Sequence, residues 1–233
     1  MMLCIADVLT REELARLQSA LTAGEFVDGS ETTGFLGKRV KNNRQLPRKG
    51  AASRALAPVI EGALLRSRMF DWAVWPKRIG AVQFSRYDAG MQYGAHVDNA
   101  IMGRPDPRWN DGASSGPFRS DVAFTVFLSD PTDYDGGELV IESPVGPQEI
   151  KLAAGEAVVY PASTLHRVAE VTRGQRFVAV GWVQSFIRDP AQREILFDLE
   201  CTMRFLQTQL PDAPETMRLF KTQSNILRMW AEP

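Results

Sequence analysis

Cysteine and histidine are scarce in this chain of 233 residues, which contains only Cys4, Cys201, His96 and His166. Two cysteines exclude a disulfide scaffold and a cysteine-rich zinc module. No apolar run approaches the roughly 18 residues that a membrane span needs, and no basic segment precedes the short apolar N-terminus, so we expect a cytoplasmic protein. The net charge of -1 argues against a generally basic nucleic-acid binder.

The hydropathy pattern predicts helices on both sides of a central β region. Thr10-Arg11-Glu12-Glu13 is a capping box that opens one helix, and an Ala/Leu-rich segment predicts a second helix over 51–68 with Pro58 near its first turn. Two further helices are expected after Asp189-Pro190. Segments bounded by Gly, Pro, Asp or Asn predict strands over 79–87, 122–128, 138–142, 149–152, 157–160, 164–171 and 176–184.

Seven short strands at close spacing favour an antiparallel sandwich or barrel. The fold class is therefore mainly β with flanking helices. We divide the chain into an N-terminal helical support region (1–76), a β core (77–187) and a C-terminal helical extension (188–233).

His96 and Asp98 stand two residues apart, and an extended segment points such residues to one face. His166 lies in a second strand-like segment. Two imidazoles and one carboxylate on adjacent strands form a facial triad that leaves three positions of an octahedral metal open. This set suits iron(II) better than structural zinc, which takes a fourth protein ligand and usually sulfur. A His-x-Asp pair alone is common by chance, but this triad uses every histidine in the chain.

Arg176 follows His166 in sequence, and Thr172-Arg173-Gly174-Gln175 between them predicts a hairpin turn that places Arg176 on the strand next to His166. A divalent metal keeps one positive charge after binding the triad. If 2-oxoglutarate completes the site, its far carboxylate requires a buried cation. The planar guanidinium of Arg176 matches a carboxylate and brings the formal charge to zero.

Several motifs together resemble one family, the iron(II)/2-oxoglutarate dioxygenases of the prolyl/lysyl hydroxylase-like group. The resemblance is closer still to the bacterial PKHD-type hydroxylases associated with iron-uptake genes. It covers nearly the whole chain. The matching stretches are Lys41-Asn42-Asn43, Gln45-Leu46, Arg86 to Asn99, Asp130-Pro131, Asp135-Gly136-Gly137-Glu138-Leu139, Tyr160-Pro161, Leu165-His166-Arg167-Val168, Thr172-Arg173-Gly174, Arg176, Trp182-Val183-Gln184-Ser185 and Arg188 to Leu199.

The resemblance implies a double-stranded β-helix, or jelly roll, that hydroxylates a substrate and releases succinate and CO2. It implies His96, Asp98 and His166 as ligands of Fe(II), and Arg176 as the residue that binds 2-oxoglutarate. The remaining cofactors are O2 and L-ascorbate (vitamin C) as reductant. A link to iron or siderophore uptake follows from the resemblance alone.

Four further residues are assigned to the site. Tyr87 resembles a tyrosine that lines the cosubstrate site, whereas a strand tyrosine of eukaryotic prolyl hydroxylases is matched here by Phe127, which has no hydroxyl. Thr125, on the same strand face, is the candidate to supply that hydroxyl. Asn99 is a candidate to hydrogen-bond a metal ligand, with a plain turn residue as the alternative. Trp109, in a Gly/Pro-rich loop, is a candidate substrate lid.

Two rival functions stay open at this stage: a non-enzymatic metal or 2-oxoglutarate sensor, and a nucleic-acid dealkylating oxygenase. The second is motivated by the basic stretch from Lys38 to Arg54, although such a run is more often a solvated face. Basic and acidic regions in different parts of the chain permit a self-complementary homodimer, with the C-terminal helices as the candidate for its apolar contact. The substrate, a small molecule or a protein, is not identified by the sequence.

Overall fold

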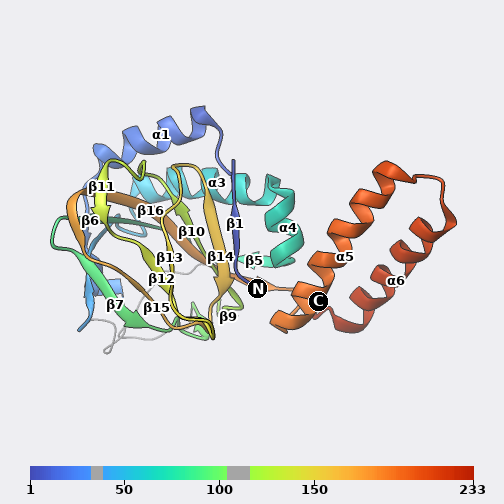
Figure 1. Cartoon of the computed structure of the whole chain (residues 1–233). Helices are drawn as coiled ribbons and strands as arrows, with labels where there is room; N and C mark the ends of the chain where they lie inside the picture. The colour runs from blue at the N-terminus through green and yellow to red at the C-terminus, as the bar shows by residue number, and fades with distance from the viewer. Residues whose placement is uncertain (33–38, 104–115) are drawn as a thin grey trace.

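The computed structural model describes residues 1–32, 39–103 and 116–233. Two antiparallel sheets face each other, and helices flank the larger one (Figure 1). The larger sheet has the order β1-β14-β10-β16-β6-β4-β2, with β5 and β11 also paired to β16. Its strands are β1 (Leu3–Ile5), β2 (Val27–Asp28), β4 (Arg44–Gln45), β5 (Pro76–Ile79), β6 (Gln83–Asp88), β10 (Val122–Phe127), β11 (Tyr134–Gly136), β14 (Ala157–Pro161) and β16 (Val171–Ser185).

The smaller sheet has the order β13-β12-β15-β7-β3, and β8 and β9 form a separate two-stranded ribbon. Between the two main sheets lies an apolar core to which both contribute, including Phe127, Val178, Leu139 and Val168. The strands are β3 (Lys41–Asn42), β7 (Gln92–His96), β8 (Ile101–Met102), β9 (Phe118–Arg119), β12 (Leu139–Ile141), β13 (Gln148–Ile150) and β15 (His166–Val168). The predicted jelly roll is confirmed.

Three helices cover the outer face of the larger sheet: α1 (Arg11–Thr22), α3 (Ala51–Arg66) and α4 (Arg68–Val74). Thr10 and Glu13 form the predicted capping box of α1. The helix predicted over 51–68 is present as α3 and ends at Arg66; the Ser67 hydroxyl then accepts from the Phe70 amide and starts α4, which the sequence did not predict. Pro58 lies inside α3 rather than near its first turn.

The last two helices, α5 (Pro190–Gln209) and α6 (Pro214–Trp230), form a hairpin that projects from the side of the jelly roll (Figure 1). Asp189 caps α5 by accepting from the amides of Ala191 and Gln192. The chain end returns to the core, where the Glu232 amide donates to the Phe186 carbonyl. None of the helices in the described ranges combines the length and hydropathy that crossing a bilayer requires.

The first 76 residues are more than helical support. Their strands β1, β2 and β4 extend the larger sheet, β3 extends the smaller one, and η1 (Gly29–Thr32) is a 3-10 turn beside them. The sequence did not predict β3 and β4, because two-residue strands are too short to show an alternating pattern.

Candidate metal and cosubstrate site

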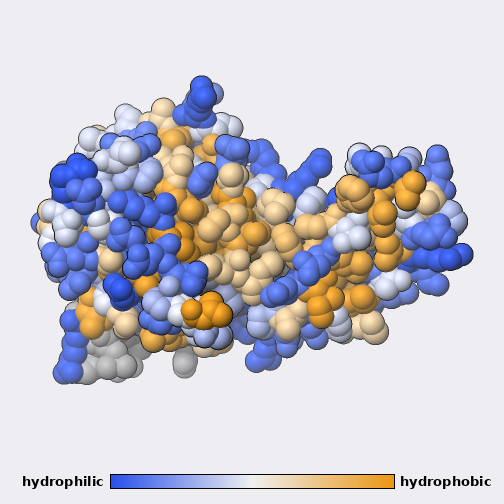
Figure 2. All heavy atoms as spheres, in the orientation of Figure 1, coloured by the Kyte–Doolittle hydropathy of each residue, from blue (hydrophilic) through white to orange (hydrophobic). Residues whose placement is uncertain are grey.

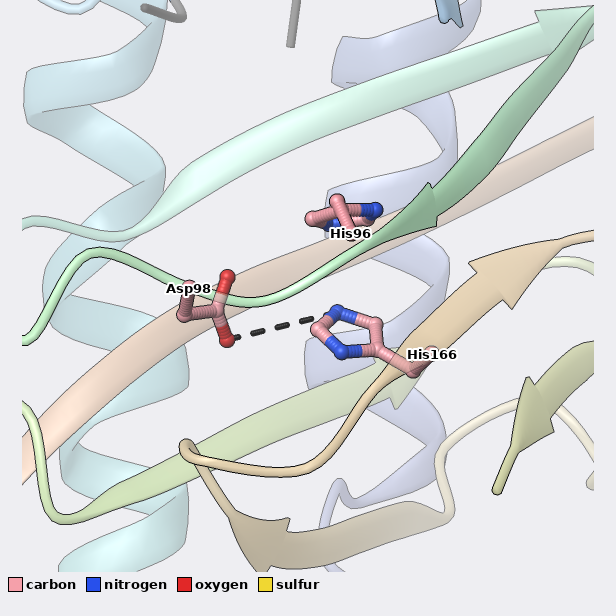
Figure 3. A group of neighbouring side chains, drawn as sticks. All are labelled: His96, Asp98 and His166. Atoms are coloured by element: carbon pink, nitrogen blue, oxygen red, sulfur yellow. Dashed lines mark ion pairs between the residues drawn. The ribbon is translucent and has the colours of Figure 1, made fainter. Parts of the chain in front are cut away.

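His96, Asp98 and His166 converge at the end of the smaller sheet (Figure 3). β7 ends at His96, β15 begins at His166, and these two residues are register partners. One ligand atom from each of the three residues lies within 4.8 Å of the others. His166 Nε2 is 4.0 Å from Asp98 Oδ2, and both side chains are almost fully buried. The structure thus brings together the three residues that the sequence assigned to a metal.

Backbone carbonyls orient both imidazoles. His96 Nδ1 lies 2.9 Å from the Gly94 carbonyl oxygen, and His166 Nδ1 lies 3.0 Å from that of Thr164. A carbonyl only accepts, so each Nδ1 carries a proton, which leaves Nε2 as the nitrogen of each ring that can bind a metal. Burial and the neighbouring His166 lower the pKa of His96 to about 4, which favours the neutral form that binds metals.

Asp98 is the one carboxylate of the cluster. Burial raises its pKa, while His166 and the indole of Trp182 lower it. Its Oδ2 has no hydrogen-bond partner among the described residues. A buried carboxylate oxygen without a hydrogen-bond partner is costly unless a counter-charge lies beside it. A divalent cation with nitrogen and oxygen ligands would remove that cost, so the donor set fits iron(II).

Aromatic rings hold the imidazoles from both sides. The Tyr93 ring stacks on His96, with centroids 3.6 Å apart and an interplanar angle of 16°. The Tyr160 ring meets His166 edge-on at 5.2 Å. This packing restricts both rings and so presets the direction of each Nε2.

Arg176 does not lie on the strand next to His166, so that prediction is wrong. Thr172 to Gln175 form no hairpin turn; they belong to β16, whose first residues pair with β11 and whose continuation pairs with β6. Gly174, at φ 74°, approaches the Asp133 backbone so closely that a side chain would not fit. Arg176 is therefore in the larger sheet, opposite Tyr87 on β6.

Arg176 nevertheless has the surroundings expected of a residue that binds a carboxylate. Its side chain is 1% exposed, and its guanidinium carbon lies 5.2 Å from the Tyr87 ring centroid and 5.4 Å from that of Phe127. Its Nε and Nη1 have no hydrogen-bond partner among the described residues. A buried guanidinium with two unsatisfied donors fits the distal carboxylate of 2-oxoglutarate.

Tyr134 is a site residue that the sequence did not single out. It is fully buried on β11, and its hydroxyl has no hydrogen-bond partner in the described part of the chain. Burial raises its pKa, and the nearby Arg176 lowers it. The two side chains are neighbours, because a Cβ on Gly137 would lie 3.0 Å from Arg176 Cδ and 3.2 Å from Tyr134 Cε2. The only sequence clue was its position between the Asp130-Pro131 and Gly136-Gly137 motifs.

The other assigned residues differ in their placement. Tyr87 lies beside Arg176, and burial raises its pKa to about 12, so it stays a hydrogen-bond donor. Thr125 lies near Tyr160, whose pKa is raised by burial and lowered by that hydroxyl. Asn99 is exposed, and its carbonyl accepts from the Ser120 hydroxyl. Trp109 falls outside the described residues.

Comparison with known proteins decides the family. A family model of the 2OG-Fe(II) oxygenase superfamily matches residues 82–184, and one of the PKHD-type hydroxylase C-terminal domain matches 190–232. A PKHD-type hydroxylase of Acaryochloris marina is 50% identical over the full length of both chains. The chain belongs to the PKHD-type hydroxylases. It is a 2-oxoglutarate-dependent dioxygenase, and its family implies Fe(II), 2-oxoglutarate and O2.

Solved structures support the fold of this PKHD-type hydroxylase. A prolyl-4-hydroxylase of Pseudomonas putida is 18% identical, with a TM-score of 0.53 over 79% of this chain and 92% of that one. HygX of Streptomyces hygroscopicus, solved with nickel and 2-oxoglutarate bound, has a TM-score of 0.52 and 18% identity over 80% of this chain and 84% of its own. At these identities the likeness supports the jelly roll alone.

Proposed function

We propose that this hydroxylase holds Fe(II) through Nε2 of His96, Nε2 of His166 and the carboxylate of Asp98. In the same proposal Arg176, Tyr87 and Tyr134 bind the distal carboxylate of 2-oxoglutarate. One observation carries it: Asp98, Arg176 and Tyr134 each have a buried polar side-chain atom without a hydrogen-bond partner among the described residues. Buried polar atoms are normally satisfied, so these await a ligand.

The charges also balance. Two neutral imidazoles leave Fe(II) and Asp98 with one positive charge, and 2-oxoglutarate with Arg176 supplies one negative charge. A formally neutral assembly can be buried without a large desolvation cost. When bound, iron supplies the activation of O2 that couples oxidation of 2-oxoglutarate, to succinate and CO2, to hydroxylation of a substrate carbon.

The protein itself orients the metal ligands and the cosubstrate and keeps water out of the site. The carbonyls of Gly94 and Thr164 keep both imidazoles in one tautomer, and Tyr93 and Tyr160 restrict their rotation. Arg176 anchors the far end of the cosubstrate, so its reacting end is positioned against the triad. Burial of the site excludes water that would otherwise compete for open metal positions.

The binding step is tested with Arg176→Met, which removes the charge and keeps much of the side-chain volume. We expect affinity for 2-oxoglutarate to fall roughly tenfold to a hundredfold, since charge-assisted hydrogen bonds are lost, while Fe(II) binding persists. Calorimetric titration of the Fe(II)-loaded protein under argon measures both. Arg173→Met is the matched control, because Arg173 lies on the same strand but is exposed and pairs with Asp135. Unchanged affinity in Arg176→Met would refute the assignment.

We also propose that the substrate is a small molecule or a protein connected with iron or siderophore uptake. L-ascorbate keeps the iron reduced in this proposal. Both parts derive from the resemblance to the bacterial group. The test is metabolite profiling of iron-limited cells that contain the active enzyme or the Asp98→Ala variant. A product heavier by one oxygen atom, present only with the active enzyme, identifies the substrate. Ascorbate is tested by omitting it from turnover assays.

A further inference from the structure

Asn43 is a buried polar residue in the short segment that passes from one sheet to the other. β3 pairs with β7 through Lys41 and Tyr93, and β4 follows directly after Asn43 and pairs with β6. Asn43 is 3% exposed, and neither its Nδ2 nor its Oδ1 has a hydrogen bond of ordinary length and angle among the described residues. Burying an amide in this way costs stability that an apolar residue would not cost, which points to a function at this position.

Asn43, Tyr87 and Arg176 form a row across the larger sheet. β4 and β6 are antiparallel, with Gln45 opposite Ser85, so the same register continued by two residues sets Asn43 opposite Tyr87. Tyr87 is in turn the register partner of Arg176 on β16. Side chains on this face reach their cross-strand partners, since Gln45 Nε2 donates to the Ser85 hydroxyl at 3.1 Å. The three residues of the row are 3%, 4% and 1% exposed, so all of them are enclosed by the fold.

The two ends of the Asn43 side-chain amide have different neighbours. A Cβ on Gly29 would overlap Oδ1 of Asn43, so that oxygen lies against η1. Nδ2 is the other end of the amide and can donate toward Tyr87. Burial raises the pKa of Tyr87 to about 12, while Arg176 and the Asn43 amide lower it. A hydrogen-bond donor lowers the pKa of a phenol because it stabilises the phenolate, which agrees with Nδ2 as the end near the hydroxyl.

We propose that Asn43 is a positioning residue of the cosubstrate site: its Nδ2 donates to the Tyr87 hydroxyl oxygen and directs the phenol proton to the distal carboxylate of 2-oxoglutarate. This inference rests on the proposed function, in which Tyr87 binds that carboxylate. A tyrosine hydroxyl has a single proton and rotates, so a donor fixed at its oxygen leaves the proton for the opposite side. A hydroxyl oriented before binding costs less to order when the carboxylate arrives. Asn43 therefore acts through Tyr87 alone.

The test is a double-mutant cycle on the Fe(II)-loaded full-length protein, with 2-oxoglutarate affinity measured by calorimetric titration under argon. Asn43→Ala and Tyr87→Phe should each weaken 2-oxoglutarate about tenfold, the loss expected for one hydrogen bond in a buried site. The double variant should bind no more weakly than Tyr87→Phe, because the amide has no hydroxyl to act on. Full affinity in Asn43→Ala, or losses that add in the double variant, overturns the inference.

A second ligand separates positioning from a general distortion of the site. 2-Oxopentanoate has the same carbon chain as 2-oxoglutarate but no distal carboxylate, so Asn43→Ala should leave its affinity unchanged. A variant that weakens both acids equally shows a merely structural role and contradicts the inference. Asn42→Ala is the matched control, because Asn42 is exposed on the same segment and donates to the Gly90 carbonyl at 3.1 Å. It should keep the affinity of the native protein for 2-oxoglutarate.

Fe(II) binding in each variant shows that the fold is intact. If Asn43→Ala binds no Fe(II), Gly29→Ala decides the question, since its Cβ displaces the Asn43 amide without removing it. That variant should lose 2-oxoglutarate affinity when Tyr87 is present and lose nothing further in Tyr87→Phe. If Tyr87→Phe weakens 2-oxoglutarate and neither Asn43→Ala nor Gly29→Ala does, only the inference fails. If Tyr87→Phe keeps full affinity, the role of Tyr87 in the proposed function fails as well.

Discussion

Gly137 occupies a position where neither the backbone nor the surroundings admit a side chain. Its φ is 69°, in the left-handed region that glycine tolerates best. A Cβ there would lie 2.8 Å from Val171 Cγ2, 3.0 Å from Arg176 Cδ and 3.2 Å from a ring carbon of Tyr134. The glycine therefore sets the position of two residues proposed to bind 2-oxoglutarate.

Gly137→Ala should accordingly lower both stability and cosubstrate affinity. The left-handed backbone alone costs about 1–2 kcal/mol, and displacement of Arg176 adds a loss of 2-oxoglutarate binding. Urea unfolding and calorimetric titration measure the two effects. Gly146→Ala is the matched control: Gly146 also has positive φ, at 105°, but a Cβ there meets nothing within 4 Å. The Gly146→Ala variant should lose stability and keep its affinity for 2-oxoglutarate. Equal affinities for 2-oxoglutarate in the Gly137→Ala and Gly146→Ala variants would contradict the positioning role of Gly137.

At the scale of elements, one ion pair connects two of the helices that cover the larger sheet. Glu13 in the first turn of α1 accepts from Arg66 at the end of α3, at 2.8 Å, and also from the Thr10 amide. The Arg66 hydrogen bond is the main cause that lowers the pKa of Glu13 below its ordinary value of 4.5. The same carboxylate thus caps α1 and joins it to α3.

This lowered pKa predicts a pH dependence of known sign. A carboxylate whose pKa is lower in the folded state stabilises the fold above its unfolded pKa and loses that effect as pH falls through the folded value. The stability advantage of the native protein over Glu13→Gln should therefore be constant at neutral pH and shrink below pH 4.5. Urea unfolding of both proteins across this range measures it. An advantage that grows in acid would exclude the ion pair as its source.

At the scale of the whole molecule, the helical hairpin of α5 and α6 leaves apolar side chains on the surface (Figure 2). The hairpin is stabilised internally by a buried bond in which Gln223 of α6 donates to Glu200 of α5. Its outer residues still include exposed large hydrophobic side chains: Ile195, Phe205, Leu210, Met217, Phe220 and Met229. Such a concentration of apolar surface is typical of an interaction site.

We expect this surface to join two copies of the chain. The basic excess of residues 1–80 and the acidic stretch 121–149 provide complementary charge for a symmetric pair. Light scattering after size exclusion should give twice the mass of 25.9 kDa. Phe205→Ser with Phe220→Ser should shift the protein toward monomer, whereas Val145→Ser, exposed on the jelly roll, should not. A monomeric native protein at micromolar concentration would exclude this dimer.

Local patterns in the sequence predicted much of the fold. The capping box of α1, the strands of the core and the proximity of His96 to Asp98 depend on neighbours a few residues apart, so they are visible in the sequence. His166 followed from the use of every histidine in the chain and Arg176 from the charge of a bound 2-oxoglutarate, and the resemblance implied the same roles for both. The described structure confirms that His166 joins the other two, and it places Arg176 between the same sheets.

The sequence by itself determined which chemical groups this protein has: two histidines, one nearby carboxylate and one arginine in a conspicuous motif. Only the tertiary structure decided which sheet holds Arg176, that Tyr134 lies beside it, and that Lys41 pairs with Tyr93. The physical reason is that strand pairing joins residues far apart in sequence. Its register depends on how both sheets pack, and no local pattern contains that information.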